Sequence, residues 1–328
     1  MESQYPIDPL DFDNVSTYPI ESRKNKVHAG MFGKPLDGSE NVLGFIAKLP
    51  RILAAENLRT LIRAILYARE TGKPILWGIG GHVVKVGLGP VIVDLMRHGF
   101  VTGIVMNGSA AIHDFEVAFR GSTSEEVEEQ IGAGRFGMAR ETGEFMNAAI
   151  NAACVDNIGM GEGLAAFIHR DDPPFHYSAV SILAESYKMR LPVTVHVAIG
   201  TDIIHVHPHA SGRNIGDATY RDFRLLCAMT KDLDSGGVYL NVGSAVVLPE
   251  VFLKAVSVVR NLGHTLGEFT TANLDFIQHY RPTQNVLKRP TQDSGQSIAL
   301  TGHHEILLPL IAAALKGSLA DTGKPENK

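Results

Sequence analysis

Residues 75–82 read ILWGIGGH, a short apolar run that passes directly into a pair of glycines. Gly72 and Pro74 precede the run, and such residues end a helix and start a new element. A short apolar run between signals of this kind is typical of a strand buried on both faces. The sequence therefore predicts a buried strand from Ile75 to Trp77, with a glycine loop at its carboxyl end.

The same alternation continues along the chain. Apolar residues at helical spacing, as from Leu58 to Leu66, are followed by short apolar runs. This pattern predicts a Rossmann-like α/β fold, a mainly parallel sheet with helices on both faces. Further strands are expected at 103–106, 193–199, 238–240, 264–270 and 297–300, and helices at 91–97, 135–153, 179–189, 219–230, 249–261 and 305–316.

Composition narrows the class of protein. The chain has 328 residues, of which 45% are hydrophobic and 20% charged, as in ordinary globular proteins. A net charge of −5 without a basic stripe argues against nucleic acid as a partner. The absence of a long apolar run argues against a membrane span. With Cys154 and Cys227 as the only cysteines, we expect a reducing compartment, the cytoplasm.

Three regions are expected along the chain. Residues 1–42 lack periodicity and predict an N-terminal arm that folds against the body or a neighbouring subunit. Residues 43–316 predict a single α/β domain, and residues 317–328 a flexible tail. In such sheets ligands bind beyond the carboxyl ends of the strands, so the loops there are the candidate sites.

The glycine loop after the first strand is one candidate. Gly78 and Gly80 match the start of a GxGxxG fingerprint, but Val83 replaces the third glycine. Because glycine has no side chain, the backbone there can approach and bind the phosphate of a nucleotide. Equally, these glycines can form a structural tight turn.

The run after the second strand, residues 107–114, reads NGSAAIHD. His113 is a candidate proton carrier near neutral pH. The alternative is that Asp114 caps a helix while His113 only packs or faces solvent.

The segment 205–209, HVHPH, contains three histidines at alternate positions. In an extended chain two of them, His205 and His207, lie about 6.6–6.8 Å apart on one face and can coordinate one metal ion. This leaves open a metal-dependent hydrolase or lyase, with His303 or His304 as a further ligand. The alternative is that the histidines belong to a polar loop or a substrate pocket.

Asp217 ends the glycine-containing segment 212–217, just before a helix expected to begin near Thr219. It is either an N-terminal helix cap or a carboxylate that binds a cationic substrate.

Taken together, these loops resemble the deoxyhypusine synthase family over about residues 43–315. The resemblance rests on residues 75–87, on the 107–114 run and on the 212–217 loop. It implies a deoxyhypusine synthase-like NAD-binding fold, a homotetramer, and transferase chemistry that oxidises spermidine with NAD and passes an aminobutyl group through a lysine.

The resemblance also implies roles for individual residues. His113 would carry protons, and Asp217 with Asn214 would bind the amine. The residues expected at NAD are Gly78, Gly80, Gly81, His82, Asn107, Gly108, Ser109, Gly243 and Ser244.

The catalytic lysine is where this chain departs from the family pattern. In the segment 281–290, RPTQNVLKRP, Pro290 stands at the lysine position and Lys288 serves only if the register slips by two. Gln284 likewise replaces a substrate-binding glutamate. The sequence thus predicts an NAD-dependent enzyme acting on a small amine or polyamine, by oxidation or aminobutyl transfer. A non-catalytic ligand-binding homologue is the other possibility.

Overall fold

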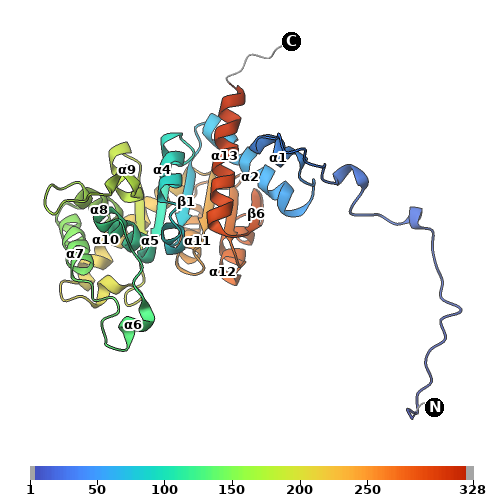
Figure 1. The fold of residues 1–328 in the computed structure, drawn as a ribbon, viewed down its shortest axis with the longest axis horizontal. Helices are drawn as coiled ribbons and strands as arrows, with labels where there is room; N and C mark the ends of the chain where they lie inside the picture. Colours follow the sequence, from blue (N-terminus) through green and yellow to red (C-terminus); the bar gives the residue numbers. More distant parts are fainter. Residues whose placement is uncertain (1–3, 323–328) are drawn as a thin grey trace.

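The structure, a computed structural model, describes residues 4–322 and contains one six-stranded sheet (Figure 1). All neighbouring strands are parallel, in the order β3-β2-β1-β4-β5-β6. The order reverses between β1 and β4, which makes this point the switch point of a doubly wound fold. The predicted Rossmann-like α/β class is confirmed. The strands are β1 (Ile75–Ile79), β2 (Gly103–Asn107), β3 (Val193–His196), β4 (Val238–Val242), β5 (Thr270–Asp275) and β6 (Gln296–Thr301).

Helices cover both faces of the sheet. Alternate side chains of each strand point to opposite faces and pack against different helices. On β1, Trp77 joins the core that contains α2, α4 and α13, whereas Leu76 joins the core that contains α11. The longer helices are α2 (Leu53–Glu70), α4 (Gly89–Arg97), α5 (Gly108–Arg120), α7 (Arg140–Val155), α8 (Met160–Ile168), α9 (Ile182–Met189), α10 (Gly212–Lys231), α11 (Val247–Asn261) and α13 (His304–Thr322). The shorter ones are α1 (Val42–Lys48), α3 (Gly81–Lys85), α6 (Val127–Ile131), α12 (Tyr280–Pro282), the 3-10 turns η1 (Ile20–Ser22), η2 (Ala29–Met31), η3 (Ser178–Val180) and η4 (Ile203–Val206), and the π-helical η5 (Thr283–Lys288).

One strand lies later in the chain than predicted. The expected strand at 264–270 is β5, which begins only at Thr270. The residues just before β5 form a turn beside Asp234. The Asp234 carboxylate accepts hydrogen bonds from Thr265 Oγ1 (3.0 Å) and Gly267 N (2.8 Å). The strand itself contains the polar residue Asn273, whose side chain accepts a hydrogen bond from buried Asn241 on β4 at 2.7 Å. This tertiary pairing satisfies polar groups that hydrophobic periodicity alone does not place in a buried strand.

Two helices are longer than predicted. The helix expected from Thr219 is α10, and it starts at Gly212 because the Ser211 side chain caps it by accepting from Asn214 N. The helix expected to end at Lys316 is α13, which continues to Thr322. Leu43 of α1 packs against Gly317, which supports this extension. Part of the predicted tail is therefore helical, and residues 323–328 lie outside the described part of the chain.

The arm runs away from the body in the first part of the chain (Figure 1), and residues 4–30 are exposed. It meets the body where Arg51 N donates to Met31 O (2.9 Å) and Lys34 N donates to Lys48 O (2.8 Å). The division into arm, domain and tail stays a prediction. Within residues 4–322, no helix combines the length and apolar character needed to cross a membrane.

Candidate functional site

The glycine loops after β1 and β4 meet at the switch point. A Cβ on Gly80 would lie 2.1 Å from the carbonyl oxygen of Gly243, and Gly80 N donates to Val242 O at 2.8 Å. Gly78 lies inside β1, where a Cβ would come within 2.7 Å of Tyr239 Oη. The close packing of β1 against β4 therefore accounts for both glycines of the partial fingerprint.

The loops after β1 and β2 also meet. A Cβ on Gly81 would lie 2.2 Å from Ser109 Oγ and 3.2 Å from His113 Cδ2. Asn107 caps α5 by accepting a hydrogen bond from Ala110 N at 2.9 Å. Ser244 plays a similar part after β4, since its Oγ accepts from Leu248 N at 3.3 Å. The structure thus gathers the predicted loops at one edge of the sheet, with His113 beside them.

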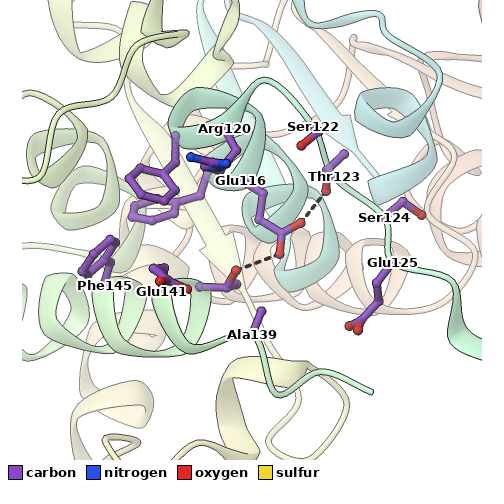
Figure 2. A pocket seen from close by; sticks show the side chains of 12 residues that line it. Glu116, Arg120, Ser122, Thr123, Ser124, Glu125, Ala139, Glu141 and Phe145 are labelled. Atoms are coloured by element: carbon purple, nitrogen blue, oxygen red, sulfur yellow. Dashed lines mark hydrogen bonds between the residues drawn. The ribbon is translucent and has the colours of Figure 1, made fainter. Parts of the chain in front are cut away.

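His113 belongs to a chain of hydrogen bonds that the sequence did not predict. Its Nδ1 lies 2.7 Å from Thr123 Oγ1. The Thr123 hydroxyl donates to Glu116 Oε2, and Thr142 Oγ1 donates to Glu116 Oε1 at 2.9 Å (Figure 2). We refer to His113, Thr123 and Glu116 as the relay.

The relay fixes the tautomer of His113 when the ring is neutral. A threonine hydroxyl has one proton, and Thr123 gives it to the Glu116 carboxylate. Thr123 therefore accepts from His113, so Nδ1 bears the hydrogen and Nε2 keeps its lone pair. The Cδ2 atom of the ring lies 3.2 Å from the place that a Cβ on Gly81 would take. Neutral His113 can therefore accept a proton at Nε2.

Glu116 is held in its charged form. Burial by itself raises the pKa of this carboxyl, but the neighbouring His113 ring and the hydrogen bonds from Thr123 and Thr142 outweigh burial and keep the pKa below its ordinary value. Glu116 stands one helical turn after His113 on α5, which is the spacing of neighbouring side chains on one face. That spacing is the signal in the sequence that could have revealed it.

A crevice of about 280 Å³ opens beside the relay. Ser109 and His113 of α5, Lys85 of α3 and Asp202 after β3 line it. Asp202 lies against the start of α5, since a Cβ on Gly108 would come within 2.2 Å of its Oδ2. Burial raises the pKa of Asp202. Lys85 was not predicted as a site residue, because only the fold brings it to this edge.

Aromatic rings form the other side of the sheet edge. His82, after β1, is exposed and lies 5.8 Å from Phe276, measured between ring centroids. His304, at the start of α13, is buried, and its Nε2 lies 3.1 Å from Leu274 O. Burial lowers the pKa of His304. Of these two histidines, only His82, which is predicted to contact the cofactor, has an exposed ring.

Asp217 and Asn214 lie away from the relay. Asp217 is inside α10 and does not cap it, and its carboxylate pairs with Arg221 at 3.0 Å. Asn214 Nδ2 donates to Asn151 Oδ1 of α7 at 2.8 Å. The Asp217 pair thus lies within α10, whereas Asn214 joins α10 to α7. Their predicted role at the amine stays a prediction.

The histidines of 205–209 are not in an extended strand, because residues Ile203–Val206 form η4. His205 Nδ1 accepts from Gly200 N (3.2 Å) and Asp202 N (3.3 Å), and burial lowers the pKa of His205. His207 and His209 stack on each other, with ring centroids 5.2 Å apart. In the part of the chain that the structure describes, no group of three or more histidine, cysteine, aspartate or glutamate side chains is arranged to hold a metal ion.

Two further predicted residues have clear surroundings. Asp114 caps α9, a different helix from its own, by accepting from Ser181 Oγ (2.6 Å), Ile182 N (2.8 Å) and Leu183 N (2.9 Å). Lys288 is exposed at the end of η5. Pro290, just beyond it, is tied through Arg260 to Leu266, a residue that precedes β5. The chain therefore runs from Lys288 toward the amino ends of the strands, away from the relay.

Comparison with known proteins gives similarity in structure only. No protein-family description and no curated protein sequence matches the chain. A candidate deoxyhypusine synthase from Entamoeba histolytica superposes with a TM-score of 0.51 at 13% identity, covering 86% of this chain and 95% of that one. The predicted similarity to the deoxyhypusine synthase fold is confirmed.

Two other solved structures have the same fold. A conserved candidate LOR/SDH protein from Methanococcus maripaludis S2 has a TM-score of 0.50 and 17% identity, over 82% of this chain and 71% of that one. AgrE, in a ternary complex with ornithine and NAD⁺, has a TM-score of 0.51 and 12% identity over 84% of this chain. The match spans only 35% of the length of AgrE.

Proposed function

We propose that this protein is an NAD-dependent enzyme that acts on a small amine or polyamine, with His113 as the proton carrier. The relay is the observation that carries the proposal. It leaves the lone pair of neutral His113 on Nε2, and His113 lines the crevice at the edge of the sheet where doubly wound folds bind their ligands. AgrE, which shares the fold, forms a ternary complex with an amine, ornithine, and NAD⁺.

The residues at the sheet edge fit a dinucleotide. Lys85 and Ser109 line the crevice and offer a cation and a hydroxyl to a phosphate. His82 and Phe276 present exposed rings on which a nucleobase can stack. When bound, NAD supplies a two-electron hydride acceptor.

The chain's own residues would handle the proton. An amine is bound as an ammonium ion at neutral pH and must lose a proton before the carbon that bears it can be oxidised. His113 Nε2 takes this proton, and the charge that develops on the ring is stabilised by Glu116 through Thr123. Loss of a hydride from the neighbouring carbon would convert the neutral amine to an iminium ion, and NAD, when bound, would supply the hydride acceptor.

Oxidation fits the geometry better than aminobutyl transfer through a lysine. A nucleophilic lysine needs a desolvated position that lowers its pKa, and Lys288 is exposed. A role for Lys288, amine binding by Asp217 and Asn214, and assembly as a homotetramer stay predictions.

The first experiment is a calorimetric titration of nucleotide-free protein with NAD, for which we expect a Kd in the micromolar range. NADH formation is then followed by absorbance with a panel of amines and polyamines. His113→Gln should keep NAD binding and lose about 100-fold in turnover. His98→Gln, which changes a histidine just after α4 that is not in the relay, is the matched control and should lose neither.

The possible results separate the alternatives. Failure to bind NAD even near millimolar concentration rejects the proposal. Binding without turnover of any amine makes the chain a non-catalytic homologue. Borohydride trapping of an adduct on Lys288 replaces simple oxidation with transfer through that lysine.

A further inference from the structure

A cavity of about 680 Å³ lies between α5 and α7, next to the crevice of the proposed reaction (Figure 2). We call it the α5–α7 cavity. Glu116, Arg120 and three phenylalanines line it, and it shares the Glu116 wall with the crevice. Its volume is in the range of small-molecule sites. Nothing in the proposed oxidation requires Arg120 or the three rings.

Glu116 presents an uncompensated negative charge to this cavity. Its side chain is 20% exposed, and its hydrogen bonds keep it ionised. Among residues 4–322, the nearest group that can carry a positive charge is His113, whose Nδ1 is 3.8 Å from Oε2. That nitrogen already donates to Thr123, so Glu116 has no permanent cation as a partner. A partly buried carboxylate in this state favours a cationic ligand.

Arg120 presents the opposite charge to the same cavity. It stands four residues after Glu116 on α5, where a carboxylate and a guanidinium normally pair. The two threonine hydroxyls instead hold the Glu116 carboxylate, as Figure 2 shows. Within the described chain Arg120 forms neither a direct ion pair nor a side-chain hydrogen bond; its charge contributes to lowering the pKa of Glu141, which also lines the cavity and pairs with Arg140. A guanidinium without a hydrogen-bond partner is suited to bind a carboxylate through two parallel hydrogen bonds.

The third feature of the cavity is an aromatic wall. Phe119 and Phe145 pack edge to face, with ring centroids 5.5 Å apart, and both are partly exposed. Phe115 lies behind them and is buried. These rings offer an apolar surface next to the two charges.

We propose that the α5–α7 cavity binds an α-amino acid with an apolar or aromatic side chain. The ammonium pairs with Glu116, the carboxylate with Arg120, and the side chain packs on Phe119 and Phe145. A ligand with both charges satisfies both unpaired groups, which neither a simple amine nor a simple acid does. His113 lines the neighbouring crevice and not this cavity, so the ligand goes beyond the proposed function as a molecule separate from the reacting amine, and its binding can be measured without turnover.

The test is calorimetry with three probes on the full chain. L-phenylalanine carries both charges, phenethylamine lacks the carboxylate, and 3-phenylpropanoate lacks the ammonium. We expect L-phenylalanine to bind at least about tenfold more tightly than either analogue. Equal binding of an analogue, or no binding of L-phenylalanine at millimolar concentration, overturns the proposal.

Variants assign the two charges. Arg120→Gln should weaken L-phenylalanine at least about tenfold and leave phenethylamine unchanged, whereas Glu116→Gln should weaken both. Arg135→Gln, an exposed arginine that does not line the cavity, is the matched control. Arg120 is exposed, so its variant keeps the test decisive even if Glu116→Gln does not fold. An Arg120→Gln protein with unchanged L-phenylalanine affinity contradicts the assignment.

The NAD titration keeps the two proposals apart. Binding of L-phenylalanine without binding of NAD supports the cavity assignment and rejects the proposal of an NAD-dependent enzyme. Binding of NAD with no binding of L-phenylalanine overturns the cavity assignment alone.

Discussion

Thr123 Oγ1 lies 2.7 Å from His113 Nδ1, although ten residues separate the two in the chain. Thr123 follows the end of α5 in a segment that turns back along the helix. Its hydroxyl donates to Glu116 and so is left to accept a hydrogen bond from the imidazole. This single contact gives the histidine a fixed tautomer and orientation. The tautomer and orientation of the proposed proton carrier therefore depend on a residue in the loop after α5.

The first prediction concerns this contact. Thr123→Val removes the hydroxyl, so neutral His113 should no longer be fixed as the Nδ1–H tautomer. Long-range ¹H–¹⁵N NMR of the ring nitrogens measures the tautomer directly. We expect amine-dependent NADH formation to fall at least about tenfold. Thr123→Ser keeps the hydroxyl and should behave as the wild type; an unchanged tautomer in the valine variant would contradict the relay.

The second prediction separates a structural aspartate from a surface one. Asp114→Ala leaves three donors at the start of α9 without their acceptor, two of them backbone NH groups. The free energy of unfolding should fall by about 3 kcal/mol or more. Asp217→Ala removes only a partly exposed pair with Arg221 within α10 and should lower the free energy of unfolding far less. Urea denaturation of both variants tests this, and equal losses would refute it.

The third prediction is a pH dependence of stability from Asp222. Burial raises the pKa of this carboxyl from 3.8 to about 7, while its Oδ2 accepts from Val195 N (2.8 Å) and Gly161 N (2.9 Å). Between these two pKa values the folded protein binds a proton that the unfolded chain has released. The contribution of Asp222 to stability must therefore fall as pH rises from about 4 to about 7.

Asp222→Asn tests this assignment. An asparagine oxygen can accept both backbone hydrogen bonds without a buried charge. The part of the pH slope due to Asp222 should disappear, and at pH above 7 the variant should be at least as stable as the wild type. Unfolding free energies measured across this range decide the point. A slope that persists unchanged in the variant assigns the pH dependence to other groups.

The fourth prediction concerns the switch point. Gly80 has φ of −90°, which any residue can adopt, so only the Gly243 carbonyl forbids a side chain there. Gly80→Ala should cost about 1–3 kcal/mol in the free energy of unfolding. Gly212→Ala adds the same methyl group at the start of α10, where nothing lies within 4 Å, and should not destabilise the protein. Thermal unfolding compares the two, and a harmless Gly80→Ala would refute the close contact of the loops.

Local pattern in the sequence determined much of the fold. The alternation of apolar strands with helical stripes predicted the parallel sheet, because periodicity reports burial directly. It placed β5 too early in the chain, because buried Asn273 owes its place to a partner on β4 that lies far away in the chain. The glycines after β1 were recognised as a loop, but whether they face a ligand or Gly243 depends on how two strands pack.

The candidate site divides in the same way. The sequence identified His113 and the small residues before it, since they follow a predicted strand. Only the tertiary structure placed Thr123 between His113 and Glu116, turned Arg120 and Glu116 toward one cavity, and put Asp217 inside a helix. Periodicity determines which face of an element is buried, whereas a site depends on hydrogen bonds between segments that are brought together only when the helices pack.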